Sequence, residues 1–239
     1  MKNFKFWAVA ALLAVSASAS AQFTNTKSTG GGVSTDISNG WSTFNVQYNA
    51  SSFIYDVSGA DNESFSAFTL EYTNAIGVSK SLPLFVEWGV GLQYGFKSDS
   101  DSKEDSGYKI DIEKNFSMLS VPIPVSLVYD YQIPNSSISI DPYLGLKLRA
   151  NILAQEKVER TMEYRGEKES EDDTRNLFDK DDMGGSDNTW NRFQVGWQIG
   201  ANARFNNKFM VGISYGSDFS ELAEKTKIGQ FTAKIGLVF

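Results

Sequence analysis

The 239-residue sequence contains no cysteine and no histidine. Their absence excludes a thiolate nucleophile, a Ser-His-Asp triad and any metal site that depends on histidine. Disulfides cannot stabilise the fold either. We therefore expect a protein that is not an enzyme, with no catalytic residues, no cofactor and no metal-binding residues.

Long hydrophobic runs are also missing. After the first 21 residues, no stretch approaches the roughly 18 consecutive apolar residues that indicate a transmembrane helix. The formal net charge is −7, so the chain lacks the basic surplus of proteins that bind nucleic acid. We expect no nucleic-acid partner.

Residues 1–21 have the features of a secretory signal peptide. Lys2 and Lys5 precede an apolar run, Phe6–Val15, which is followed by small residues up to Ala21. An uncleaved membrane anchor is the less favoured alternative, because a spanning helix needs about 20 apolar residues. We expect cleavage between Ala21 and Gln22, followed by a flexible, Gly-rich leader over residues 22–40.

The rest of the chain alternates bulky apolar residues with polar residues or glycine. Successive side chains of a strand point to opposite faces, so this pattern predicts strands with one apolar and one polar face. A tilted strand of about 9–11 residues can cross a bilayer. The predicted strands are Trp41–Val57, Ser64–Ile76, Leu82–Lys97, Phe116–Tyr131, Ile138–Leu153, Trp190–Phe205, Lys208–Gly216 and Ile228–Phe239.

These segments predict an all-β fold: an eight-stranded antiparallel up-and-down transmembrane barrel over residues 41–239. Connections after the second, fourth and sixth strands are short, as in periplasmic turns. The others predict charged outer loops at about 58–63, 98–115, 155–189 and 217–227. A soluble sandwich or lipocalin-like barrel is less favoured, because it would place its polar face outside.

The loop at 155–189 carries twelve acidic and six basic side chains, so we expect it to project into water. Two acidic groups could offer oxygen ligands to Ca²⁺, but their spacing does not match an EF-hand. Solvated loops are the favoured interpretation. The two groups are Asp99, Asp101, Glu104 and Asp105, and Asp179, Asp181, Asp182 and Asp187.

Local features predict three departures from regular strands. A change of phase near Ser51 and Ser52 indicates a bulge. Pro122 and Pro124 lack backbone donors and predict an edge or an interrupted register. Asn206 and its neighbour predict a tight hairpin, because asparagine tolerates positive φ.

Seven charged residues fall on the predicted inner face of the barrel. Eight strands leave an interior just wide enough for side chains, so we expect these charges to fill it. Burying a charge without a partner costs free energy, so these charges must form ion pairs or hydrogen bonds with each other or with buried water. A narrow pore lined by them is the alternative. They are Glu71, Glu87, Lys147, Arg149, Arg192, Arg204 and Lys234.

Two consecutive strands resemble the outer-membrane β-barrel family that includes the PorT-like proteins. The first strand matches at Val121-Pro122 and Tyr129. The second has the Pro-Tyr-x-Gly pattern, with a lysine where a second glycine is common. Its residues are Pro142, Tyr143, Gly145 and Lys147.

This resemblance implies a location in the outer membrane of a Gram-negative cell envelope, with outer-membrane lipid and the barrel-assembly machinery as partners. The segment Lys234–Phe239 also looks like the C-terminal strand that this machinery recognises. The expected assembly residues are Phe231, Ile235, Leu237 and Phe239.

Three functions remain open. The favoured one is a structural or interaction role, in which the outer loops contact an extracellular or envelope protein partner. The second is a small porin-like pore or transport barrel for ions or hydrophobic ligands. The third, implied only by the resemblance, is an accessory role in a PorT-like secretion system.

Overall fold

The computed structural model describes residues 40–57, 59, 61–79, 82–105, 108–164, 167–183 and 189–239. The predicted signal peptide and almost all of the predicted leader lie outside this part of the chain. Within the described ranges, no helix is long and apolar enough to cross a membrane. The strands are β1 (Trp41–Tyr55), β2 (Glu63–Gly77), β3 (Leu84–Asp105), β4 (Tyr108–Tyr129), β5 (Tyr131–Gln132), β6 (Ile138–Tyr164), β7 (Glu167–Asn176), β8 (Phe193–Phe205), β9 (Phe209–Asp218) and β10 (Thr226–Val238).

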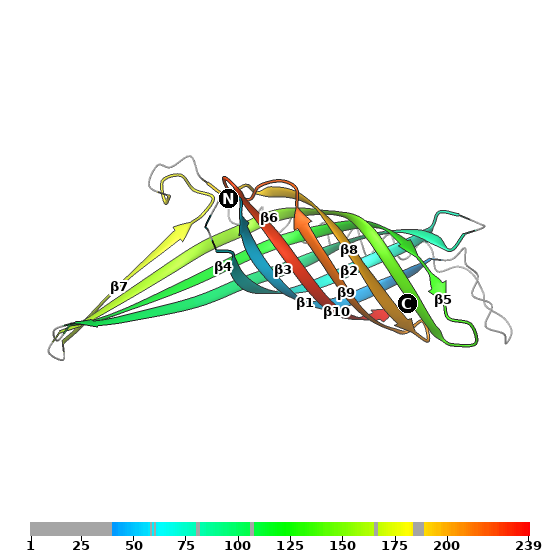
Figure 1. Cartoon of the computed structure of the whole chain (residues 1–239), viewed down its shortest axis with the longest axis horizontal. Helices are drawn as coiled ribbons and strands as arrows, with labels where there is room; N and C mark the ends of the chain where they lie inside the picture. Colours follow the sequence, from blue (N-terminus) through cyan, green and yellow to red (C-terminus); the bar gives the residue numbers. More distant parts are fainter. Residues whose placement is uncertain are drawn as a thin grey trace, which may run out of the picture. The chain divides into compact units, whose positions relative to one another are not determined.

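Eight of these strands form a closed antiparallel ring in the order β1, β2, β3, β4, β6, β8, β9 and β10 (Figure 1). The ring closes between β1 and β10, from Thr43 opposite Val238 to Tyr55 opposite Thr226. β5 and β7 each pair with β6 only. Closure matters because an unpaired strand edge would leave backbone groups unsatisfied in lipid. The predicted eight-stranded barrel is confirmed.

Apolar side chains cover the outside of the ring and polar ones fill the inside. On β1, Phe44, Val46 and Tyr48 are each nearly half exposed, while Asn45 and Gln47 between them are buried. Aromatic rings lie side by side across neighbouring strands near the ends of this belt, as in Tyr48–Phe68 and Trp197–Tyr215. Such belts, flanked by aromatic residues, face the bilayer in outer-membrane barrels.

Three ring strands, β3, β4 and β6, continue past the ring and form a sheet with β7, which we call the extension (Figure 1). Its order is β3, β4, β6 and β7, over residues 97–105, 108–116, 155–164 and 167–176. The segments predicted as loops at 98–115 and 155–189 thus contain paired strands over 98–105, 108–115, 155–164 and 167–176, which the prediction lacked. Strand pairing satisfies the backbone groups there. Ile110 and Ile112 occupy alternate positions, as apolar residues of a strand do. The many charged residues around them made this alternation hard to recognise in the sequence.

The predicted bulge in the first strand is also wrong. β1 pairs without a break with both neighbours, and Phe53 points into the barrel. The apolar residues change face because the interior itself becomes apolar at this end. A register shift occurs instead between β4 and β6, where Leu119 opposes Leu153 and Ser120 opposes Asn151.

The other two local predictions are confirmed. Pairing between β3 and β4 stops after Trp88 opposite Val125 and resumes at Gln93, and both prolines of β4 lie in this gap. Asn206 and Asn207 have φ of 53° and 50°, and the Lys208 amide donates to the Phe205 carbonyl at 3.0 Å. The gap and the turn follow from the missing proline donor and the tolerance of asparagine for positive φ.

Candidate functional site

Four of the seven predicted charges converge in the middle of the barrel. They line a cavity of about 20 Å³, which has room for about one water molecule. Gln47 donates to the Glu71 carboxylate at 2.6 Å, and the Lys147 ammonium donates to Gln230. The four are Glu71, Glu87, Lys147 and Lys234.

The remaining two of these four also meet interior partners. Thr73 donates to the Glu87 carboxylate at 3.2 Å, and its hydroxyl lies 2.7 Å from that of Thr43. The Lys234 ammonium lies 4.7 Å from the centre of the Tyr143 ring. Each buried charge therefore meets a polar or aromatic group, which lowers the cost of its burial.

Two arginines form buried ion pairs. Arg149 lies 3.0 Å from the Asp218 carboxylate. Arg204 donates to Asp141 at 2.6 Å and 3.2 Å and lies 2.9 Å from Asp130. The predicted set of inner charges did not include the carboxylates of Asp130, Asp141 and Asp218. Asp218 lies in a predicted loop, and extending the alternation of β9 by two residues would have placed it inside.

Arg192 does not join the interior charges, and its prediction as an inner residue is wrong. β8 begins at Phe193, so Arg192 precedes the strand and is exposed. Its guanidinium lies over the Phe178 ring at 4.3 Å and donates to the Ile152 carbonyl. The strand pattern was continued too far toward the N-terminus of this segment.

Aromatic clusters close both ends of the interior. At the end next to the extension, the Phe53 ring lies 4.6 Å from Phe65 and 5.5 Å from Trp190. Leu177 and Leu222 from the connecting segments complete this cluster. A glycine leaves space for it, since a Cβ atom at Gly95 would lie 3.1 Å from the Phe65 ring.

At the opposite end, the Trp41 and Phe85 rings lie tilted at 56° to each other, with ring centres 4.6 Å apart. The Arg204 guanidinium lies over the Trp41 ring, 3.7 Å from its centre. Ala75, Val128 and Tyr143 pack into the same cluster. The polar layer with its small cavity therefore lies between two aromatic clusters.

A larger cavity, which we call the mouth pocket, lies on the outer side of the first cluster. It has a volume of about 320 Å³, and Phe53, Phe116 and Trp190 contribute its aromatic walls. Lys97 lies on its rim, 2.6 Å from Asp99 and 3.1 Å from Glu63. The hydrogen bond that Lys97 donates to Asp99 and its contacts with Glu63 raise the pKa of Lys97 above its usual value.

The two faces of the extension differ. One face continues the inner surface of the barrel, and we call it the lumen-side face. Its cross-strand rows include Asp101, Ile112, Arg160 and Glu171, and Lys103, Ile110, Met162 and Glu169. The opposite, outer face carries rows of polar residues, such as Ser100, Glu113, Glu159 and Asp172.

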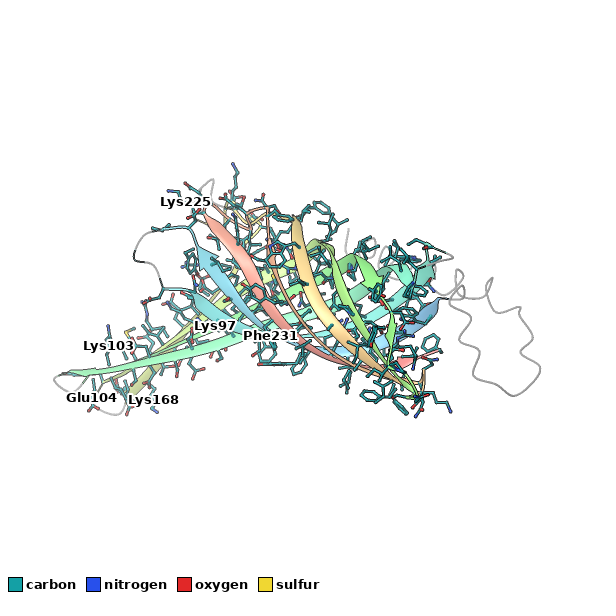
Figure 2. The ribbon with its side chains drawn as sticks, turned by 45° about the vertical axis from the view of Figure 1, so that its right-hand side comes forward. Lys97, Lys103, Glu104, Lys168, Lys225 and Phe231 are labelled. Carbon is teal, nitrogen blue, oxygen red and sulfur yellow. The ribbon has the colours of Figure 1, made fainter. Side chains whose placement is uncertain are left out.

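Charges on the outer face are largely paired with one another. Lys157 contacts Glu159 and lies 3.5 Å from Asp172, and Lys168 lies 3.3 Å from Glu163. Lys109 pairs with Asp111 at 2.9 Å; hydrogen bonds from Ser102 and then Lys109 lower the pKa of the Asp111 carboxyl. Figure 2 shows Lys103, Glu104 and Lys168 near the far end of the extension and Lys97 closer to the barrel.

The acidic groups considered as Ca²⁺ ligands do not gather into a metal site. Over the described residues, no group of three or more acidic side chains is placed to hold a metal ion. Asp187 and the side chain of Asp105 lie outside the described part. Asp179 and Asp182 accept hydrogen bonds from the backbone amides of Asp181 and Asn176.

The proposed assembly residues of β10 all face outward. Phe231, Ile235, Leu237 and Phe239 are 49% to 67% exposed, which places them in the apolar belt. The backbone of Phe239 exchanges two hydrogen bonds with Ser42 at the start of β1. Recognition of this strand by the barrel-assembly machinery stays a prediction.

Several solved structures are similar to this chain at low sequence identity. No curated protein matches the chain. Among solved structures, Ail from Yersinia pestis is 18% identical, with 84% of this chain and 99% of that chain covered and a TM-score of 0.36. Neisserial surface protein A is 13% identical, with 83% and 97% covered and a TM-score of 0.42. The outer membrane enzyme PagL is 14% identical, with 81% and 97% covered and a TM-score of 0.44.

A family model gives the assignment. The model of the outer membrane protein beta-barrel domain matches residues 7–239. The PorT-like subtype stays a prediction. Because this match covers nearly the whole sequence, the chain belongs to the outer membrane protein beta-barrel domain family and is an integral barrel of the bacterial outer membrane.

Proposed function

We propose that this protein is a closed, non-enzymatic barrel that acts by presenting its extension and mouth to a protein partner outside the membrane. The observation that carries this proposal is the filled interior. A space of about 20 Å³ in the polar layer holds about one water molecule, far less than a conducting path requires. Function must then depend on surfaces beyond the barrel wall.

The extension supports an interaction role because the barrel has no structural need for it. Strand closure is complete without β7 and without the outer parts of β3, β4 and β6. Its strands carry apolar residues outside the membrane belt, including Ile110, Ile112 and Met162. Met162 is 40% exposed, whereas Ile110 and Ile112 are half-buried. Apolar groups that reach the surface together commonly mark interaction sites.

A non-enzymatic role is supported by the composition and by the placement of the interior charges. The sequence has no histidine or cysteine to serve as a base or a thiolate. Glu71, Arg149 and Arg204 are engaged with neighbours inside the wall. The likeness to PagL is one of fold and brings no activity to this chain.

Single-channel recording in a planar bilayer tests the closed barrel. We expect no stable openings from the refolded protein, because both ends of its interior carry aromatic clusters. Heat-modifiable migration and protease protection would establish that the protein is folded and inserted. Openings whose conductance changes in Glu87→Gln or Arg149→Gln would contradict the proposal and favour a pore.

A further inference from the structure

The lumen-side face of the extension has an apolar centre that leads to the mouth pocket. Ile110 of β4 is opposite Met162 of β6, while Ile112 is opposite Arg160. Lys114, which is opposite Val158, separates Ile112 from Phe116 on this face, and Lys114 and Phe116 both line the mouth pocket. With neighbouring strands about 5 Å apart, the stripe is about 10 Å wide, and it is about 20 Å long at roughly 3.4 Å per residue.

Acidic side chains border this stripe on both outer strands. On β3, Asp99 and Asp101 lie between Lys97 and Lys103. On β7, Glu169, Glu171 and Asp173 follow one another on this face before Arg175. Within the described residues, no ion pair engages Asp101, Glu169 or Glu171, although Arg160 is opposite Glu171 in the register. The paired charges of the outer face show no comparable row of free carboxylates.

The stripe and pocket together suit a single polypeptide segment. A pocket of about 320 Å³ with aromatic walls can take one large apolar side chain as an anchor. A width of two strands accommodates one further chain rather than a broad protein surface. The acidic border on β7 favours a cationic partner and disfavours anionic lipid headgroups. It also disfavours a second copy, whose identical border would repel.

We propose that the lumen-side face and the mouth pocket form a docking groove for a cationic amphipathic segment of a partner protein, anchored by one aromatic side chain. This inference rests on the proposed function, since it names the partner class of the extension. The apolar side of the segment covers the stripe. Its basic residues meet the carboxylates of β3 and β7.

A labelled synthetic peptide tests the groove. The probe is a fluorescein-labelled peptide of nine residues, with one tryptophan followed by four Val-Lys repeats. Its fluorescence anisotropy is measured with the refolded full-length mature protein in zwitterionic micelles at low salt, against empty micelles. We expect saturable binding, with at least about tenfold weaker binding when glycine replaces the tryptophan or glutamate replaces the lysines.

Matched variants separate the groove from general electrostatic attraction. Glu169→Gln combined with Glu171→Gln should weaken binding at least about fivefold. Glu113→Gln combined with Asp172→Asn removes the same charge from the outer face and should change binding less than about twofold. Ala223→Phe should fill the mouth pocket and weaken binding about tenfold.

Several results would overturn the groove. They are no binding by the folded protein, equal losses in the two double variants, unchanged affinity when the peptide lacks tryptophan, or a stable dimer burying the extension. Failed peptide binding with a silent bilayer would remove the groove and leave the closed barrel standing. Charge-sensitive channels would instead remove the proposed function.

Discussion

Arg204 illustrates how a charge is held inside the barrel at the level of the membrane. Asp141 accepts two of its hydrogen bonds, Asp130 lies 2.9 Å away, and Trp41 covers its planar surface. Taking any ion out of water is expensive, so an arginine survives here only with several partners. The same reasoning applies to Arg149 and Asp218.

Removing one partner of this cluster should be costly. We expect Asp141→Asn to lower the free energy of unfolding by about 3–5 kcal/mol, because it leaves the Arg204 charge undercompensated. Urea titration of the protein in lipid vesicles measures the change. Asp173→Asn, which removes an exposed partner of Arg175, is the control and should cost less than about 1 kcal/mol. Equal losses of unfolding free energy in the two variants would show that burial does not determine how much an ion pair contributes to stability.

At the scale of elements, the strands of the extension serve two environments. Their inner parts belong to the barrel wall, while their outer parts form a sheet with a polar outer face. On β3, Phe96 is the last apolar residue of the outward row and Ser98 follows it. The membrane belt therefore ends within a continuous strand, and no break in hydrogen bonding marks the boundary.

Shortening the extension should leave the barrel folded. One variant joins Ser100 to Glu113 and Val158 to Asp173 through Asn-Gly turns, since both pairs are opposite in the register. We expect heat-modifiable migration to persist and the unfolding free energy to fall by less than about 2 kcal/mol, because the aromatic clusters remain.

The control for this truncation is Phe53→Ala, which cuts into the aromatic cluster and should cost about 3–5 kcal/mol. The same urea titration and gel migration report both variants. A truncated protein that no longer folds would mean that the extension is part of the folding unit. Its assignment as an interaction element would then fail.

At the scale of the whole barrel, the two ends are unequal. The short turns after β2 and β8 lie at one end with the start of β1 and the end of β10. The extension and the connection from β9 to β10 lie at the other. In outer-membrane barrels, short turns face the periplasm and longer segments face outward. We therefore expect the extension to be extracellular.

Single-cysteine labelling tests this orientation cleanly, because the chain has no cysteine of its own. Ser100→Cys lies on the extension, and Lys208→Cys lies at the hairpin of the opposite end; both positions are exposed. A membrane-impermeant maleimide should label Ser100→Cys on intact cells and Lys208→Cys only after permeabilisation. The reverse pattern would invert the orientation.

The alternation of polarity was sufficient to predict the barrel wall. All eight ring strands were identified, and the outward stripes lie where expected except at the end of β1, where Phe53 faces inward. Lipid and interior impose opposite demands on successive residues. Composition and charge did not predict the strands of the outer segments. Strands outside the membrane have no row of lipid-facing apolar residues, so polar and apolar residues alternate only weakly in their sequence.

The sequence by itself determined which residues face lipid and which face inward, since that choice depends on position along one strand. Only the tertiary structure decided which inward residues meet. Arg204 and Asp141 are 63 positions apart, and Lys147 and Gln230 are 83 apart. The aromatic clusters, the mouth pocket and the charged borders of the extension likewise join distant strands. Ring closure and cross-strand register create these contacts, and local polarity contains no information about them.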